Sequence, residues 1–316
     1  MTKIASSSSI NTLKTSVLFL VFNRLDTTKQ VFEAIRQAKP PRLYVAADGG
    51  REKKQGEADK VKAVRDYITS NIDWECEVKT LFRDKNLGCK MAVSGAIDWF
   101  FANEEMGIIL EDDCLPSQSF FLFCEELLEK YKDDMRVWHI GGNNFGFDGK
   151  TYCDYSFIRF PQVWGWASWR SRWLKYDKNL TEYYNDFITN TNLSTSLNIS
   201  KKNAIKLSNR FLLSSTGQIN TWDYQWQATV IKNKGLCVVP NKNLISNLGD
   251  GPDATHTQKD KIRTHLKTNE LSFPLNQTKN FLIDYHEEEF FKKKMNIVAS
   301  NIFQKATIRI KKLLFK

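Results

Sequence analysis

Apolar runs alternate with amphipathic stretches through the first third of the chain. Uninterrupted apolar segments at Val17–Phe22, Leu43–Ala47 and Ile108–Leu110 are typical of buried parallel strands. Val78–Phe82 predicts a further strand, and the stretches between these segments carry apolar residues three and four positions apart, which indicates helices. Repeated alternation of this kind predicts an α/β fold, in which helices flank both faces of a mostly parallel, Rossmann-like sheet.

The second half of the chain has a less regular pattern. Strands are predicted from Val137 and over Leu236–Pro240, whereas residues 178–215 are polar and only partly helical in pattern. No linker or internal repeat divides the chain, so we expect a single domain over residues 17–290. In chain order, the expected parts are a disordered tail (1–16), a sheet-built half (17–115), a loop-rich half (116–290) and a C-terminal helix (291–316).

The composition is typical of a globular enzyme. Apolar residues make up 41% of the chain and charged residues 26%, and no apolar stretch approaches the roughly 20 residues that span a membrane. The first 16 residues lack an apolar centre, so they do not predict a signal peptide. The six cysteines are scattered without a C-x-x-C pair, which favours a reducing compartment over a zinc site. We therefore expect a cytoplasmic protein.

Part of the net charge of +10 is concentrated at the C-terminus. Residues 292–316 hold eight Lys or Arg residues and no acid, and apolar residues recur among them at helical spacing. A basic amphipathic helix of this kind indicates peripheral binding at an anionic membrane surface, here the inner face of the plasma membrane. The pattern leaves equally open a terminal helix that packs its apolar face on the body. Because no recognition motif accompanies the charge, we expect no nucleic-acid partner.

Three consecutive acids, Glu111, Asp112 and Asp113, directly follow the last of the apolar runs. At the end of a buried strand they would repel one another and lose hydration unless something compensated for their charge. Carboxylate clusters suit hard divalent ions, so we predict Mg²⁺ or Mn²⁺ at the sheet edge where open α/β sheets bind ligands. The alternative, that the acids stabilise the next helix, is weaker because Cys114-Leu115-Pro116 separates them from it.

Other motifs add candidate chemistry or exclude it. Neither G-x-G-x-x-G nor the P-loop pattern occurs, so neither motif holds a ligand. Of the four histidines, His256 lies in a Gly-rich stretch and could complete a metal site or donate a hydrogen bond to a diphosphate. A structural or surface role for this histidine is the alternative.

Aromatic residues surround a further candidate group in the second half. Asp223 lies between Trp222 and Tyr224, and this surrounding would reduce its hydration and raise its basicity, as a general base requires. It could also cap the helix that follows. Trp164 and Trp166 flank Gly165, and exposed faces of these indoles would suit sugar stacking, although indoles are equally typical of a core.

In this order, the motifs resemble those of the GT-A class of nucleotide-sugar glycosyltransferases, and they are most similar to the N-acetylglucosaminyltransferase I family and its bacterial relatives. The resemblance runs from about Val17 to His256. It implies an inverting, metal-dependent transferase that moves a hexosyl or N-acetylhexosaminyl group from a UDP-sugar. The implied acceptor is a hydroxyl of a glycan or lipid-linked glycan, in bacterial surface polysaccharide synthesis.

The resemblance also implies roles for individual residues. One departure concerns Tyr224, which stands where the family has a second aspartate, so that either the preceding aspartate is the base or the register has shifted. The implied roles are nucleotide-sugar binding for Arg24, Asp48, Glu111, Asp112, Trp164, Gly165 and Trp166, metal binding for Asp113 and His256, and general-base catalysis for Asp223.

Two other functions remain as alternatives. A sugar-1-phosphate nucleotidyltransferase would be built on a related sheet, but the chain lacks a Gly-rich, Arg/Lys-containing phosphate loop after the first strand. A non-catalytic carbohydrate- or membrane-binding protein would be favoured by loss of the acids, and all three acids are intact.

Overall fold

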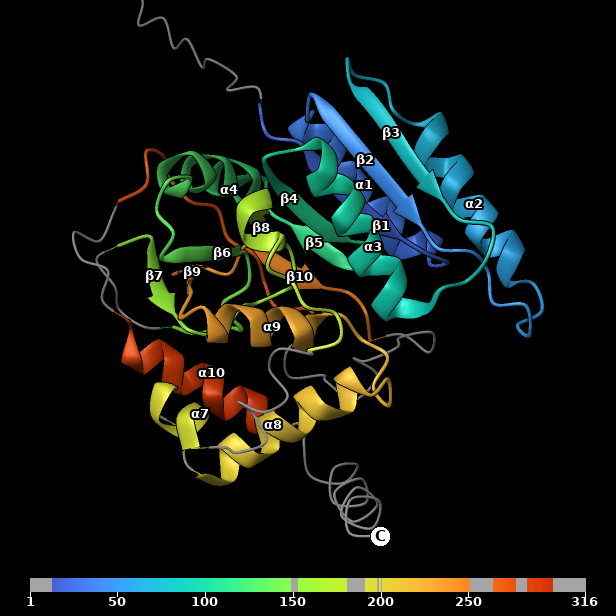
Figure 1. Cartoon of the computed structure of the whole chain (residues 1–316). Helices are drawn as coiled ribbons and strands as arrows, with labels where there is room; N and C mark the ends of the chain where they lie inside the picture. The colour runs from blue at the N-terminus through green and yellow to red at the C-terminus, as the bar shows by residue number, and fades with distance from the viewer. Residues whose placement is uncertain are drawn as a thin grey trace, which may run out of the picture.

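A mixed sheet of eight strands runs through the described part of the protein (Figure 1). The computed structural model describes residues 13–148, 153–180, 191–197, 199, 201–250, 264–276 and 283–297. A smaller sheet pairs β5 (Cys114–Pro116) with β10 (Ile245–Asn247). In spatial order, the large sheet contains β3 (Glu77–Phe82), β2 (Arg42–Ala47), β1 (Val17–Val21), β4 (Met106–Glu111), β8 (Trp166–Trp169), β6 (Val137–Gly141), β9 (Leu236–Pro240) and β7 (Tyr155–Ile158).

Six of the eight strands run in the same direction. Neighbouring strands from β3 to β4 are parallel, and β8 is antiparallel to both β4 and β6. Thus β6 and its parallel neighbour β9 keep the direction of β1, and β8 and β7 run the opposite way. The carboxyl ends of β1, β2 and β4 gather at one edge, and the predicted α/β fold with a mostly parallel sheet is confirmed.

Helices cover both faces of this sheet, and alternating strand residues pack against them in two cores (Figure 1). Within the described ranges, no helix is long and apolar enough to cross a membrane. The first face carries α1 (Leu25–Ala38), α2 (Glu57–Ser70) and α4 (Gln118–Tyr131), and the second carries α3 (Gly88–Asn103), α5 (Arg170–Trp173), α7 (Thr191–Ser196), α8 (Lys201–Ser215), α9 (Asp223–Lys232) and α10 (Tyr285–Ile297).

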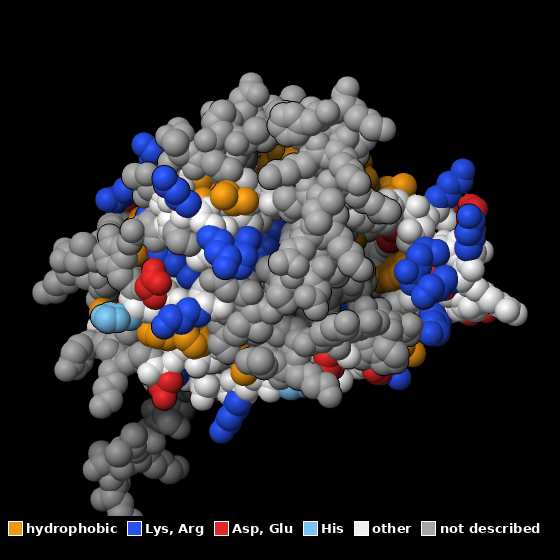
Figure 2. Space-filling model, turned by 90° about the horizontal axis from the view of Figure 1, so that it is seen from below, with side chains coloured by type: hydrophobic (Ala, Val, Ile, Leu, Met, Phe, Trp, Pro, Cys, Tyr) orange, Lys and Arg blue, Asp and Glu red, His pale blue; other side chains and the backbone are white. Residues whose placement is uncertain are grey.

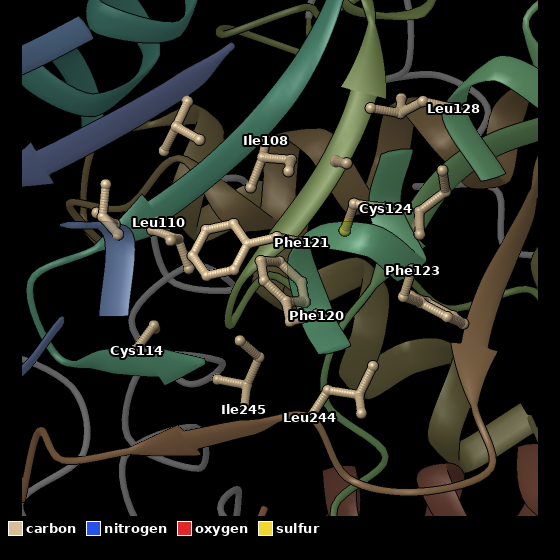
Figure 3. Packing of buried hydrophobic residues seen from close by; sticks show 14 of the residues in the cluster. Ile108, Leu110, Cys114, Phe120, Phe121, Phe123, Cys124, Leu128, Leu244 and Ile245 are labelled. Carbon is tan, nitrogen blue, oxygen red and sulfur yellow. The ribbon is translucent and has the colours of Figure 1, made fainter. Parts of the chain in front are cut away.

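The first core lies under α4. Phe120 and Phe121 of this helix are buried against Ile108 and Leu110 of β4, as Figure 3 shows. Ile245 of β10 completes the packing from the other side of the same group. Each large side chain buried in this way contributes about 1.5–3 kcal/mol relative to an exposed one, so this packing fixes the end of β4 that carries the three acids.

A cluster of indole rings forms the centre of the second core. Trp166 is fully buried, and its ring stacks with those of His139 at 5.1 Å and Trp222 at 5.6 Å between centroids. His139 Nε2 donates to the Gln162 carbonyl oxygen at 3.0 Å, while its Nδ1 accepts from Trp226 Nε1 at 3.2 Å. Burial lowers the pKa of His139 to about 3, so this ring is neutral and structural.

The folded body begins earlier than predicted. Leu13 and Ser16, which we assigned to a disordered tail, are buried, and the Thr15 N–H donates to the Glu125 carboxylate of α4 at 2.9 Å. The tail prediction is therefore wrong for residues 13–16. Residues 1–12 lie outside the described ranges.

The helix α10 is part of the body, and the expected domain boundary at residue 291 falls inside it. Phe291 is fully buried in the second core, and Glu288 forms ion pairs with Arg159 and, at 3.1 Å, with Lys292. At Phe291 and Lys292 this helix is therefore buried against the body. The remainder of the basic segment, residues 298–316, lies outside the described residues, and its membrane binding stays a prediction.

Glu287, also on α10, is a carboxyl group that the fold keeps protonated. Its side chain is 1% exposed and accepts a hydrogen bond from the Ser156 hydroxyl. Burial, opposed by that hydrogen bond and aided by Asp284, raises its pKa from 4.5 to about 8. Between these two values the unfolded chain has released a proton that the folded chain retains. The contribution of Glu287 to stability should therefore be greatest below pH 4.5 and should fall as the pH rises to about 8.

We predict that Glu287→Gln reduces this loss of stability, because the amide keeps a polar partner for Ser156 but cannot ionise. Urea unfolding at about pH 5.5 and about pH 8.5 measures the effect. The variant should gain on the order of 1–3 kcal/mol relative to the wild type between the two conditions. Glu289→Gln, on the exposed side of the same helix, is the matched control and should keep the wild-type slope. An unchanged slope in Glu287→Gln would contradict the assignment.

Candidate functional site

A cavity of about 310 Å³ lies at the carboxyl ends of β1, β2 and β4, beside the first turn of α3. This is the edge at which open α/β sheets bind ligands. A more open hollow of about 400 Å³ lies beside α2 and the end of β3, and no predicted site residue lines it. The charged residues that line the 310 Å³ cavity are Arg24, Arg51, Arg83, Asp48, Glu111 and Asp112.

Arg24 neutralises two of the three consecutive acids. It follows β1, whose Leu20 pairs in register with Glu111 of β4, so the ends of the two strands lie side by side. The Arg24 guanidinium donates to the Asp112 carboxylate and, at 2.9 Å, to Asp113 Oδ2. Burial opposes the charge on Arg24, but the two carboxylates outweigh it and raise the pKa of Arg24 above its usual value.

Asp112 is the most deeply buried of the three acids, with 3% of its surface exposed. The Phe22 N–H donates to its Oδ2 at 3.2 Å. Burial, opposed by Arg24 and aided by Asp113, raises the pKa of Asp112 to about 6. Protein groups thus hold the Asp112 carboxylate at the wall of the cavity. This is the environment expected of a residue that positions other groups of the site.

Glu111 has a different environment. It lines the cavity, and its carboxylate accepts no hydrogen bond from any residue in the described ranges. Burial and the charges of Asp113 and Asp112 raise its pKa to about 8, with Arg24 acting in the opposite direction. A cation bound beside Glu111 would reverse this rise.

The residues of this edge fit a hard divalent ion in chemistry, because Glu111 and Asp113 offer carboxylate oxygens to it. Asp113 uses Oδ2 for Arg24, and its Oδ1 accepts a weak hydrogen bond from the Cys114 thiol at 3.4 Å. Within the described ranges, no group of three or more His, Cys, Asp or Glu side chains is placed to hold a metal. The predicted fourth donor, His256, lies outside those ranges, so the metal site stays a prediction.

Asp48 serves the first turn of α3. Its carboxylate accepts hydrogen bonds from the Leu87 and Gly88 N–H groups, each at 3.0 Å. The Lys90 N–H donates to Asn220 Oδ1 at 2.9 Å. Protein groups therefore satisfy these three donors at the start of α3, which anion binding at a helix terminus would otherwise use. Asp48 also lines the cavity, and its role in nucleotide-sugar binding stays a prediction.

The sequence reasoning missed a second arginine on the cavity wall. Arg51 lies with its guanidinium carbon 5.6 Å from the centroid of the Phe22 ring. The Arg51 guanidinium and, at 2.8 Å, the Arg51 backbone N–H donate hydrogen bonds to the Glu57 carboxylate. Glu57 also accepts a hydrogen bond from the Asn23 side chain at 2.9 Å. Hydrogen bonds from Arg51, opposed by burial, lower the pKa of Glu57 to about 2. The signal in the sequence was an arginine three residues after Asp48, at the end of a predicted strand.

Asp223 is the first residue of α9 and does not line the cavity, but its charge acts on Glu111. Its Oδ1 accepts from the Thr221 hydroxyl and, at 2.9 Å, from the Tyr224 N–H. The N-cap of α9 is Trp222, so the alternative role of Asp223 as the cap is wrong. Its charge also reaches the cavity: burial and the carboxylates of Glu111 and Asp223 raise the pKa of Cys89, which lines it. Asp223 contributes likewise to the raised pKa of Glu111.

The segment around Gly165 is not on the cavity wall. Trp166 is fully buried in the second core, so it presents no face to a sugar, and the expected stacking role is wrong for this residue. Trp164 is half-buried and packs edge-on against Phe145 at 5.2 Å. Gly165 has a φ of +64°, and a Cβ there would lie 2.4 Å from Ile245 Cδ1, so the turn requires glycine.

Comparisons with known proteins give similarities of fold only. No family model and no curated protein matches the chain, so membership of the N-acetylglucosaminyltransferase I family is not confirmed. A UDP-glucose pyrophosphorylase complexed with UDP-glucose is 8% identical, with 72% of this chain and 90% of that chain covered, at a TM-score of 0.36. HddC from Yersinia pseudotuberculosis is 9% identical, with 50% and 78% covered, at 0.30.

A third solved structure, 4-diphosphocytidyl-2C-methyl-D-erythritolsynthase from Anaerococcus prevotii, is 9% identical, with 52% of this chain and 77% of that chain covered. Its TM-score is 0.33. Similarities of this size carry no argument about function. The candidate site is therefore argued from its own residues.

We predict that Arg24→Met destabilises the protein in metal-free buffer, because it leaves two buried carboxylates without their cation. Removing one partner of a buried ion pair costs about 3–5 kcal/mol, which urea unfolding would measure. If the acids can hold a divalent ion, millimolar Mn²⁺ should restore much of the loss. Arg36→Met is the control, because Arg36 also pairs with two acids but at the surface, where the cost is about 1 kcal/mol or less. A loss that Mn²⁺ does not reduce would contradict the metal prediction.

Proposed function

We propose that this protein is a glycosyltransferase that takes a sugar from a nucleoside-diphosphate donor, with uridine as the expected base. One observation carries the proposal: a 310 Å³ cavity at the carboxyl edge of the sheet joins three arginines to the acidic cluster that ends β4. Its volume is in the range of small-ligand sites. Mixed charge of this kind suits a diphosphate, which needs cations, together with a sugar, whose hydroxyls need acceptors.

The arginines would hold the donor. Arg24, Arg51 and Arg83 line the cavity, and guanidinium groups bind phosphate oxygens through paired hydrogen bonds. Arg51 is fixed by Glu57, so little side-chain freedom would be lost when it binds the donor. A Mg²⁺ or Mn²⁺ ion, when held by Asp113 beside Glu111, would add Lewis-acid neutralisation of the leaving diphosphate.

Asp223 would activate the acceptor hydroxyl. Inversion in a single displacement requires a carboxylate that takes the hydroxyl proton from the face opposite the leaving group. Thr221 and the Tyr224 N–H hold Oδ1 of Asp223, and no described residue donates a hydrogen bond to Oδ2, which can accept the proton. The acceptor, a glycan or lipid-linked glycan, would enter from the side of α9.

A sugar-1-phosphate nucleotidyltransferase is the second candidate. The same three arginines would suit its nucleotide substrate. Only Phe22, Asn23 and Arg24 connect β1 to α1, and this connection contains no glycine. So short a connection is poorly suited to wrapping a triphosphate in backbone N–H groups.

The two functions release different products, and this difference gives the test. The protein should be incubated with a panel of nucleotide sugars and glycan acceptors, with and without Mn²⁺, and the released nucleotide identified. Nucleoside diphosphate released with glycan product would support the glycosyltransferase. Pyrophosphate released from a nucleoside triphosphate and a sugar-1-phosphate would support the nucleotidyltransferase instead. If neither product forms under any condition, both proposed functions are wrong.

We predict that Asp223→Asn lowers turnover by about 10²–10⁴-fold, the usual size of general-base assistance, because the amide cannot take the proton. Affinity for the donor nucleotide, measured by calorimetry, should change little. Asp59→Asn, an exposed carboxylate at the start of α2, is the matched control and should keep full activity. Near-normal turnover in Asp223→Asn, or a product with retained anomeric configuration, would move the role away from Asp223.

A further inference from the structure

The helix α8 differs in charge from the other long helices of the described structure. It carries Lys201, Lys202, Lys206 and Arg210 and no acid, whereas α1, α2, α3, α4, α9 and α10 each include at least one carboxylate. On those helices acids offset the bases, as between Lys62 and Asp66 of α2. Because α8 contains no acid, none of its bases is offset by a neighbour on the same helix, and the helix carries a net positive charge.

The exposed side of α8 combines this charge with an apolar residue. Its buried side is formed by Ala204, Leu207 and Phe211, which pack in the second core. The opposite side, which we call the basic face of α8, consists of Lys201, Lys202, Ile205 and Lys206. Ile205 is 48% exposed and lies between lysines in the sequence. Figure 2 views the molecule from the side of α7 and α8 and shows Lys and Arg side chains gathered there.

A small hollow adjoins the basic face, between α8 and α10. Its volume is about 30 Å³, and three basic residues line it: Lys206, Arg210 and Lys292. Arg210 is 7% exposed and Lys292 is 8% exposed, so both cations are largely withdrawn from water. Lys292 pairs with both Glu288 at 3.1 Å and Glu289 at 2.7 Å, and Lys206 and Arg210 are the other bases on the wall of the hollow. The hollow has room for about two water-sized atoms, too little for a phosphate group, so a lipid phosphate would contact these bases from outside it.

We propose that the basic face of α8 docks on the surface of an anionic lipid bilayer, with lipid phosphates against its lysines. Lysines around an exposed aliphatic residue suit the boundary between headgroups and acyl chains, where charge and apolar area both contribute. A nucleic acid would meet the same charge but offers no apolar layer for Ile205. The chain after α10 is also basic, because residues 298–316 contain five Lys or Arg residues and no acid.

This surface is connected to the candidate site. The carboxyl end of α8 reaches the first turn of α3, where the Lys90 ammonium group donates to the Ser214 carbonyl oxygen at 3.2 Å. From Lys202 to Ser214 the helix rises about 18 Å, so docking through α8 would hold the cavity close to the bilayer. If the proposed function is correct, that position suits an acceptor carried on a lipid. The docking itself does not depend on that function.

The test is sedimentation of the full chain with vesicles of phosphatidylcholine alone and with phosphatidylglycerol added. The triple variant Lys201→Gln, Lys202→Gln and Lys206→Gln should bind anionic vesicles about 100-fold more weakly, at about fivefold per lysine. The matched control removes the same charge from lysines outside α8. It carries Lys53→Gln, Lys54→Gln and Lys60→Gln, all at exposed positions before and within α2, and should bind as the wild type.

Further measurements distinguish lipid phosphate from free phosphate and test the contribution of Ile205. Ile205→Ser should also weaken vesicle binding, whereas a purely electrostatic contact would not respond to it. Sodium phosphate should displace the vesicles no better than sodium chloride at equal ionic strength. Equal binding by the two triple variants, or a duplex oligonucleotide that binds more tightly than the vesicles, would overturn the proposal. Stronger competition by phosphate would show a site for free phosphate and would overturn it as well.

Discussion

The ion pairs of Arg24 with Asp112 and Asp113 make the rest of the site physically acceptable. Three carboxylates at the end of a buried strand would repel one another and lose hydration, and a guanidinium group on the neighbouring strand end removes most of that cost. Because β1 and β4 are paired in parallel, the base and the acids reach the same edge without any long-range loop. Glu111 remains beside these pairs as the carboxylate that a ligand or ion can still change.

The two cores position different parts of the site. The phenylalanines of α4 fix the end of β4 and hence the acids, whereas the indole cluster fixes the start of α9 and hence Asp223. Trp222 stacks on Trp166, and its carbonyl oxygen accepts from the Tyr176 hydroxyl at 3.1 Å. Packing on both faces of the sheet therefore sets the geometry of a single cavity. The tryptophans act through this packing, since Trp166 has no exposed surface to offer a ligand.

Much of the sheet follows from the sequence, because long apolar runs separated by amphipathic helices have few other interpretations. The strands β7 and β8 do not, since each is a fully buried segment of four residues in a region without alternation. The gathering of Arg24, Asp48 and the three acids is predictable from strand ends alone. The partners of these residues are not: Arg24 as the cation for two acids, Asp48 as the acceptor for α3, and Arg51 held by Glu57 all depend on tertiary contacts.

The contact of Asn220 with the first turn of α3 has a consequence for how the protein unfolds. Asn220 accepts a hydrogen bond from the Lys90 N–H, and the Lys90 ammonium group donates to the Ser214 carbonyl oxygen. Lys90 of the sheet-built half is thus joined to the end of α8 and to the segment that connects α8 to α9. Loosening either half would leave these polar groups unsatisfied in the other. We therefore expect the two halves to unfold together in a single thermal transition. A ligand that binds at the cavity would raise the melting temperature of the whole chain.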